Sequence, residues 1–379
     1  MTLRRLAAVA RKEFLHVFRD WRSLYLSLAI PVILIMLFGY ALTLDLRHVP
    51  TVVWDQSQTP QSRDLVALYA GSPYFTIEEH LFSYTRIQHH LDRGSAMVAL
   101  VIPRDFSAAL AAGKQTAVQV ICDGSDANTS RLAMNYATAI AMIYSTNVTA
   151  RQMAINGKTG FEPPVEMAPR SWYNPDLRSQ NVIIPGIIAI VMVVIASMLT
   201  SVTIAREWET GTMEQLIATP LKGPELIFGK AVPYFVIGMT DVAIAVSMGR
   251  WLFKVPIVGN TALLFAMAAI FLTGALFWGM TLSIVLKSQV LANQIAIVSG
   301  YLPTLILSGF VFAIENMPLP IQCITYIVPA RYFIALLRGI YMKGIGLEIL
   351  WLDAVLLSMY AVFMVILANR KFRFKLDPP

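Results

Sequence analysis

Residues 183–205 have the sequence IIPGIIAIVMVVIASMLTSVTIA, an apolar run that contains no charged side chain. A helix of about 20 such residues is long enough to cross the hydrocarbon core of a bilayer, which is about 30 Å thick. A run that is apolar on every side has no polar face to present to water. The stretch therefore predicts a helix that spans a membrane.

Further apolar segments flank this helix on both sides. Four of them are long enough to span a bilayer, namely residues 23–44, 261–286, 290–314 and 347–367. A fifth segment, residues 226–249, contains Pro233 and Asp241 but is also expected to cross. Only 14% of the 379 residues are charged, against about 25% in an ordinary soluble domain. The sequence predicts a polytopic α-helical membrane protein with six transmembrane helices.

Basic residues beside the spans predict the orientation of the chain. The two terminal tails, the loop 206–230 and Lys287 together carry fourteen Lys and Arg, whereas the short loops on the other side carry five. Loops rich in Lys and Arg stay in the cytoplasm. Both termini are therefore predicted to be cytoplasmic, which agrees with an even number of spans.

Residues 1–22 form a separate feature with segregated side chains. At 100° per residue, apolar residues fall on one side (Leu3, Leu6, Ala7, Ala10, Phe14, Val17, Phe18, Trp21) and basic residues on the other (Arg4, Arg5, Arg11, Lys12, Arg19, Arg22). This pattern predicts an amphipathic helix that lies in the cytoplasmic interface of the membrane. A solvated charged tail is the alternative.

Residues 45–178 are soluble in character and separate the first two spans. Residues 45–182 hold 11 Lys and Arg and 12 Asp and Glu, whereas the rest of the chain holds 19 and 11. The basic excess thus lies beside the spans, which favours anionic lipid head groups over nucleic acid as its partner. Strands are expected over residues 49–54, 74–77, 96–102 and 117–122, and helices over 62–70, 84–93, 104–112 and 128–155. This alternation predicts an α/β domain. The predicted orientation places it on the outer side of the membrane, which for a bacterial inner membrane is the periplasm.

Residues 315–346 are too polar to span the membrane yet are rich in large apolar side chains. Pro318, Pro320 and Pro329 divide the segment. It is interpreted as two short helices that form a re-entrant hairpin in the outer leaflet.

No enzymatic or metal-binding motif stands out. The segment 223–231, GPELIFGKA, has five residues between its glycines and Ala after the Lys, whereas a phosphate-binding Walker A loop has four and then Ser or Thr. The chain is therefore not expected to be an enzyme or to bind a cofactor. Cys122 and Cys323 lack metal-ligand spacing, and two unpaired cysteines are favoured over a disulfide.

The loop after the second span has the sequence REWETGTMEQLIATPLK, residues 206–222. Gly211 and Thr212 are expected to break one helix and cap the next, with Glu214 in its first turn. Met213, Leu216 and Ile217 would give this short helix an apolar side, and Pro220 would end it. An external protein that contacts a helix at the membrane surface between two spans can transmit force to both spans. The alternative is an ordinary loop with a solvated charge run.

This loop resembles the signature of permease subunits of type-2 ATP-binding cassette (ABC) exporters. In that family an R-E-x-E-x-G-T-x-E-x-L segment, followed by Pro and Lys, forms the element that couples to the ATPase. The matching positions here are Glu207, Glu209, Gly211, Thr212, Glu214, Leu216, Pro220 and Lys230. A second match runs through residues 307–310, 317–318, 329–333, 338–339 and 344, and it resembles the end of span five and the outer hairpin. Ala313 departs from the Pro of some members.

The resemblance covers the whole chain and is closest to the drug-efflux branch in the bacterial inner membrane. It implies a dimer with an identical or paralogous permease above two ATPase subunits, which bind ATP and Mg²⁺. It also allows a periplasmic adaptor and an outer-membrane channel as partners. A central cavity between spans two and five is implied, and polar candidates for its lining are Ser197, Thr200, Asn293, Gln294, Tyr301, Thr304 and Ser308. Such residues can instead bond one helix to another.

Asp241 lies roughly 16 Å along a helix from Lys230, and so near the middle of the membrane. A lone acid there is costly. It could relay protons or contact a cationic substrate, but a bond between neighbouring helices is favoured. The sequence therefore indicates an ATP-driven exporter of drugs or other amphipathic molecules. Asp241 motivates the alternative of a proton-coupled drug antiporter, and a receptor or scaffold is the third hypothesis.

Overall fold

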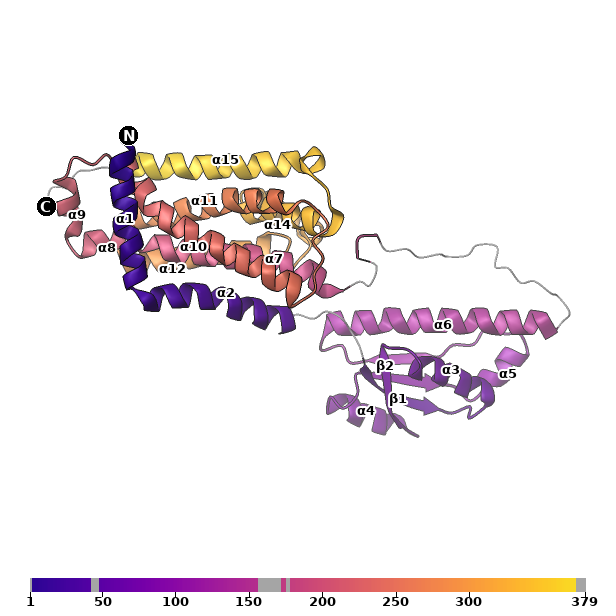
Figure 1. Ribbon diagram of the computed structural model, residues 1–379. Helices are drawn as coiled ribbons and strands as arrows, with labels where there is room; N and C mark the ends of the chain where they lie inside the picture. The colour runs from indigo at the N-terminus through magenta and orange to yellow at the C-terminus, as the bar shows by residue number, and fades with distance from the viewer. Residues whose placement is uncertain (1, 42–47, 156–171, 175–177, 373–379) are drawn as a thin grey trace. The chain divides into compact units, whose positions relative to one another are not determined.

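The computed structural model describes residues 2–41, 48–155, 172–174 and 178–372 (Figure 1). The chain divides into two compact units, one formed by Met1–Thr43 with Arg170–Pro379 and the other by Leu44–Pro169. The first unit is a bundle of helices, and the second combines helices with a sheet.

The helical unit contains the apolar segments of the sequence. Its elements are α1 (Leu3–Arg19), α2 (Trp21–Ala41), α7 (Ser179–Ser201), α8 (Thr203–Glu209), α9 (Thr212–Ile217), α10 (Gly223–Trp251), α11 (Thr261–Leu286), α12 (Gln289–Leu307), α13 (Leu319–Thr325), α14 (Pro329–Arg338) and α15 (Leu347–Lys371). Among the described residues, five helices are long and apolar enough to cross a membrane, or six if the bent pair α13–α14 is one span. The prediction of a polytopic helical membrane protein is confirmed.

The first predicted span corresponds to α2, whose apolar part, Ser27–Tyr40, is shorter than the other spans. Its expected last residues, 42–44, lie outside the described residues. Six crossings with α2 as the first therefore remain a prediction.

Helix α7 is the core of the bundle. It packs against α2, α10, α11, α12 and α14, and Ile184, Ile188 and Ala189 are fully buried. Two glycines allow close packing against it. A Cβ on Gly186 of α7 would lie 2.0 Å from the Phe310 ring, and one on Gly279 of α11 would lie 2.2 Å from the Thr200 hydroxyl oxygen.

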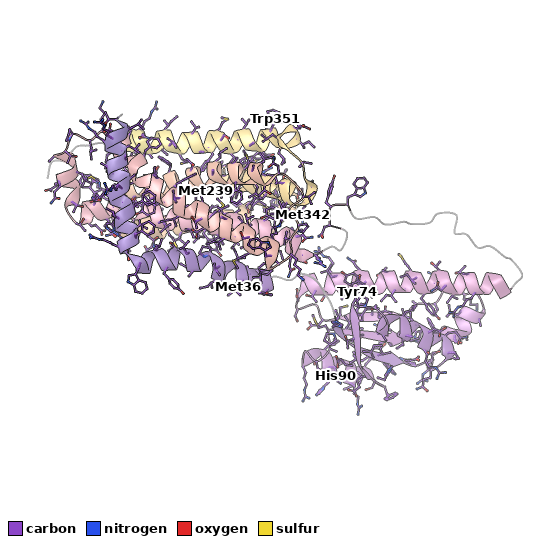
Figure 2. The ribbon with its side chains drawn as sticks, in the orientation of Figure 1. Met36, Tyr74, His90, Met239, Met342 and Trp351 are labelled. Carbon is purple, nitrogen blue, oxygen red and sulfur yellow. The ribbon has the colours of Figure 1, made fainter. Side chains whose placement is uncertain are left out.

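The outer helices of the bundle expose apolar side chains. Figure 2 shows Met36 and Trp351 on the outer sides of α2 and α15, and both side chains are exposed. On α12 the exposed apolar face comprises Leu291, Ile295, Val298, Leu302 and Ile306. Faces of this kind are stable against lipid or a protein partner and not against water.

Residues 315–346, the segment of the expected outer hairpin, contain short helices that begin at or beside prolines. Pro318 precedes α13, and Pro329 is the first residue of α14. The pair Leu319–Thr325 and Pro329–Lys343 is bent by 82°, which is the geometry of a broken span or of a re-entrant loop.

The second unit is built on a four-stranded sheet in the order β2-β1-β3-β4. Its elements are β1 (Val49–Asp55), α3 (Pro60–Ala70), β2 (Phe75–His80), α4 (Tyr84–Asp92), β3 (Val98–Ile102), α5 (Phe106–Ala111), β4 (Gln119–Cys122) and α6 (Ala127–Ile155). Strand β1 is parallel to β2 and β3, and β4 is antiparallel to β3. All of β3 is buried because α3 and α6 cover one face of the sheet and α4 the other. Both faces of a parallel sheet need such cover.

We predict that Gly279→Ala destabilises the bundle by about 1–3 kcal/mol, the usual cost of overpacking. The added methyl group would have to separate α11 from α7, because the Ser197 carbonyl oxygen also lies within 2.9 Å of its position. Gly346→Ala is the matched control, since a Cβ there meets nothing within 4 Å. Thermal unfolding of the purified protein measures both. Equal midpoints for the two variants would contradict the packing seen here.

Candidate functional site

The predicted coupling segment begins at a break between α7 and α8. The first N–H groups of a helix lack partners within the helix. Here the Ser283 hydroxyl oxygen of α11 accepts hydrogen bonds from the backbone N–H groups of Ile204 (3.0 Å) and Ala205 (2.8 Å). The start of α8 is thereby fixed to α11.

The turn between α8 and α9 depends on Gly211. Its φ of +73° lies in the left-handed region, which glycine adopts without steric cost. Gly211 occupies the N-cap position of α9, so the expected break and cap lie at this glycine, whereas Thr212 is the first residue of α9 and its side chain does not cap the helix. The Thr212 hydroxyl instead donates to the Glu207 carboxylate at the end of α8. Glu214 lies in the first turn of α9, as expected.

Helix α9 has a buried and an exposed side. Met213, Leu216 and Ile217 belong to one hydrophobic cluster with residues of α8, α10, α11 and α15. The opposite side exposes Glu214, and Glu209, Gly211 and Pro220 are exposed beside it. The segment therefore presents an acidic surface while it is held to the bundle by its apolar side.

A buried ionic cluster joins this segment to two other helices. Lys230 of α10 is 2% exposed and Glu13 of α1 is 4% exposed. The Lys230 ammonium binds the Glu13 carboxylate and lies 2.9 Å from Oε1 of Glu207 on α8. Nζ of Lys12 lies 3.5 Å from the same oxygen. Two acids and two bases neutralise each other, which buried charges require because an unpaired buried ion costs several kcal/mol.

Helix α1 makes further contacts with the start of α10. Glu225, which is fully buried, accepts hydrogen bonds from the backbone N–H groups of Thr2 (2.6 Å) and Lys222 (3.1 Å). Arg5 donates to the Pro220 carbonyl at 2.5 Å. A Cβ on Gly229 would lie 2.7 Å from Cβ of Val9, so glycine allows the two helices to approach closely. The N-terminal helix is thus bound along the first turns of α10.

The acidic end of α8 also holds the start of α12. Glu209 accepts hydrogen bonds from the backbone N–H (2.8 Å) and the side-chain amide (2.5 Å) of Gln289. Nε of Arg206 donates to the Gln289 side-chain oxygen at 3.3 Å. The α8–α9 segment is therefore tied to α1, α10, α11 and α12 together.

The structure separates the seven polar residues that were predicted to line a pathway. Ser197 and Thr304 line a cavity of about 320 Å³ between α7, α11, α12 and α14. Asn293 lines a different cavity, of about 290 Å³, and Gln294 is exposed. The Thr200 hydroxyl lies 2.7 Å from the Ala196 carbonyl oxygen and 2.9 Å from that of Leu276, so it bonds α7 to α11.

The two remaining predicted pathway residues are buried or partly buried. Tyr301 is half-buried, and Ser308 is buried. The hydroxyl oxygens of Ser197 and Ser308 are buried without a hydrogen-bond partner among the described residues.

Asp241 is 2% exposed, and neither of its carboxylate oxygens has a hydrogen-bond partner among the described residues. The favoured interpretation, a polar bond between neighbouring helices, is therefore wrong for this conformation. Apolar surroundings stabilise a neutral carboxyl group far better than an ionised one.

Sequence reasoning missed four residues of the site: Glu13, Glu225, Ser283 and Gln289. A signal existed for Glu13, because a helical projection of α1 places it beside Leu6 and Val17, at the edge of the apolar side. An acid that is buried in that position needs a basic partner. Ser283 and Gln289 gave no such signal, because their roles depend on which helices meet.

The two cysteines lie outside this site, Cys122 in β4 and Cys323 in α13. Cys122 and Cys323 are free thiols, and burial raises the pKa of Cys122, which makes its thiol less reactive. Within the described ranges, no three His, Cys, Asp or Glu side chains are grouped as metal ligands.

The described residues thus form a multi-pass bundle of apolar helices whose surface element, α8–α9, is tied to α1, α10, α11 and α12. The chain belongs to the ABC-2 family transporter proteins, whose family model matches residues 21–369. Members of this class are permease components and not enzymes themselves, and the family implies separate ATPase subunits.

Three curated relatives match most or all of the chain. It is 33% identical to the probable multidrug ABC transporter permease YbhS of Escherichia coli over 380 residues, which cover 100% of this chain and 99% of that protein. It is 29% identical to the probable multidrug ABC transporter permease YbhR of E. coli, with 92% of both chains covered. The inner membrane transport permease YhhJ of E. coli is 26% identical over 81% of this chain and 80% of its own.

We predict that Lys230→Met destabilises the protein by about 3–5 kcal/mol, because it leaves the Glu13 carboxylate buried without a basic partner. Lys12→Met is the matched control. The Lys12 side chain is 55% exposed, so its ion pair contributes at most about 1 kcal/mol. Thermal unfolding of the purified protein compares them. A Lys230 variant as stable as the Lys12 variant would contradict the cluster.

Proposed function

We propose that this chain is the membrane-spanning subunit of an ATP-driven exporter. It moves drugs or other amphipathic small molecules out of the cytoplasm or the inner membrane, and separate ATPase subunits that bind ATP and Mg²⁺ provide the energy. The observation that carries the proposal is the α8–α9 segment, whose acidic side is exposed while its other contacts reach α1, α10, α11 and α12. A partner that moves this segment moves four helices.

The proposed topology has both termini and the α8–α9 segment in the cytoplasm. The α/β unit then lies in the periplasm, because a single span, α2, precedes it. The distribution of Lys and Arg supports this orientation. In the periplasm the α/β unit is accessible to an adaptor that leads to an outer-membrane channel.

The proposed assembly contains a second permease, identical or paralogous. The exposed apolar face of α12 supports it, because that face also carries the polar Gln294. A side-chain amide is poorly accommodated by lipid and well accommodated by a hydrogen bond across a protein interface. The cavity with Ser197 and Thr304 lies between α7 and α12 and is the proposed section of the pathway.

The function is tested in inverted membrane vesicles that contain the permease together with its ATPase subunits. We expect a fluorescent amphipathic dye to accumulate when ATP and Mg²⁺ are added, and to do so after a protonophore has removed the proton gradient. Accumulation that needs no ATP, or that stops with the gradient while ATP is held constant, would contradict the proposal. The second result would support the proton-coupled antiporter, which family membership does not favour.

We predict that Glu214→Lys uncouples ATP hydrolysis from transport. The change reverses a charge on the exposed side of α9 without touching the buried side. The measurement compares ATP-dependent dye transport with ATPase activity in the reconstituted complex, and transport should fall at least tenfold while permease assembly persists. Glu348→Lys, an exposed acid in the first turn of α15, is the matched control and should retain transport. Equal transport by both variants would contradict the assigned role of α9.

A further inference from the structure

A second cavity lies at the bend between α1 and α2, within one copy of the chain. Its volume is about 290 Å³, near the lower end of the range of about 300–1,000 Å³ for ligand pockets. It is enclosed by α1, α2, α7, α8, α10 and one residue of α12. None of the contacts of the ionic cluster uses this space.

The cavity is apolar at one end and polar at the other. Most of its apolar wall comes from α2, α7 and α10, and its aliphatic and Met residues are Val17, Leu24, Ile30, Ile195, Met198, Leu199, Val202 and Ile237. Its polar residues include Arg206 on α8, His16 and Asp20 at the end of α1, and Asn293 on α12. Because α1 is the amphipathic helix and α2 the apolar one that follows it, the polar end lies where a bilayer changes from head groups to hydrocarbon.

Arg206 determines the charge that this cavity prefers. Its guanidinium group makes one hydrogen bond among the described residues, from Nε to Gln289, and its terminal amino groups are not engaged in any. Asp20, the acidic member of the described lining, already interacts with another residue. A guanidinium binds phosphate and carboxylate groups through two parallel hydrogen bonds.

We propose that this cavity binds a single-chain amphiphile with an acidic head group. The apolar chain enters between α2, α7 and α10, and the phosphate or carboxylate binds Arg206. Such a molecule enters from the inner leaflet. As an entry site for cargo the cavity rests on the proposed export function, whereas the binding itself does not.

The position of Arg206 gives the cavity a second property. Arg206 and Glu209 hold the same Gln289 side chain, and Glu207 between them belongs to the ionic cluster. An acidic group on Arg206 therefore binds directly beside the segment proposed to receive motion from the ATPase. The Arg206 side chain therefore links occupancy of the cavity to the position of α8.

The test uses the purified full-length protein in nanodiscs of phosphatidylcholine, without ATP or ATPase subunits. The probe is dodecyl phosphate with a photoreactive diazirine at the end of its chain. Its unlabelled competitors are dodecyl phosphate, dodecyltrimethylammonium, dodecyl maltoside and inorganic phosphate. The first three competitors share the dodecyl chain and differ in the charge of the head group. Inorganic phosphate carries the acidic group without the chain.

We expect the label on peptides of α2 and α7. Unlabelled dodecyl phosphate should compete at a concentration about tenfold lower than the cationic or the neutral amphiphile. Neither of those two head groups can form the charge-assisted hydrogen bonds with Arg206. Inorganic phosphate should not compete. Arg206→Gln should abolish the preference for the acidic head group, and Met198→Trp should abolish labelling because it fills the cavity.

Gln289→Ala is the structural control, since it removes the hydrogen bond to Arg206 but keeps the guanidinium, and it should retain the preference. Label outside the cavity, equal competition by all head groups, preference for the cation, or unchanged behaviour of Arg206→Gln would each overturn the proposal. Because the assay contains no ATP, these results are independent of whether ATP drives export.

Discussion

The arrangement of α1, α8 and α10 depends on one ammonium group, that of Lys230. Buried at the start of α10, it holds the carboxylates of Glu13 on α1 and Glu207 on α8. A buried ion of this kind stabilises little by itself, because its attraction to the acids is offset by its desolvation. What it provides is specificity: any displacement of α1, α8 or α10 relative to the others leaves a charge without a partner.

Because the charges of Lys230, Glu13 and Glu207 must stay paired, the helices that carry them are also held by close contacts nearby. Gly229 brings α1 against α10, Gly211 turns the chain back so that Thr212 reaches Glu207, and Ser283 fixes the start of α8 on α11. Glu209 extends the same connected group to the start of α12. A force applied to the exposed side of α9 is therefore carried by polar contacts that are geometrically specific, and not by apolar packing alone, which tolerates sliding more easily.

The membrane character and the helices of the bundle could be predicted from the sequence, because an uncharged apolar run as long as residues 183–205 is typical of a membrane-spanning helix. The strands expected over 49–54 and 117–122 are present as β1 and β4, with ends shifted by one or two residues. The contacts of the site were less predictable. Glu13 and Lys230 are 217 residues apart, and their pairing depends on the angle at which α1 lies on α10. The break at Gly211 was predicted correctly, but the hydrogen bond from the Thr212 side chain to the preceding helix was not. The bond between helices that was expected for Asp241 is absent among the described residues.

The central claim is that the α8–α9 segment and the helices tied to it move together when the ATPase acts, and the part of it that depends on Lys230 is the joint motion of α1, α8, α9 and α10. Pulsed electron paramagnetic resonance tests it directly, with spin labels on Ala8 of α1 and Gln215 of α9, both exposed, in the complex of permease and ATPase subunits. The account predicts that the distance between these labels is the same with and without ATP, and that it becomes broadly distributed in Lys230→Met. A distance that changes with ATP in the unmodified cluster would contradict the account.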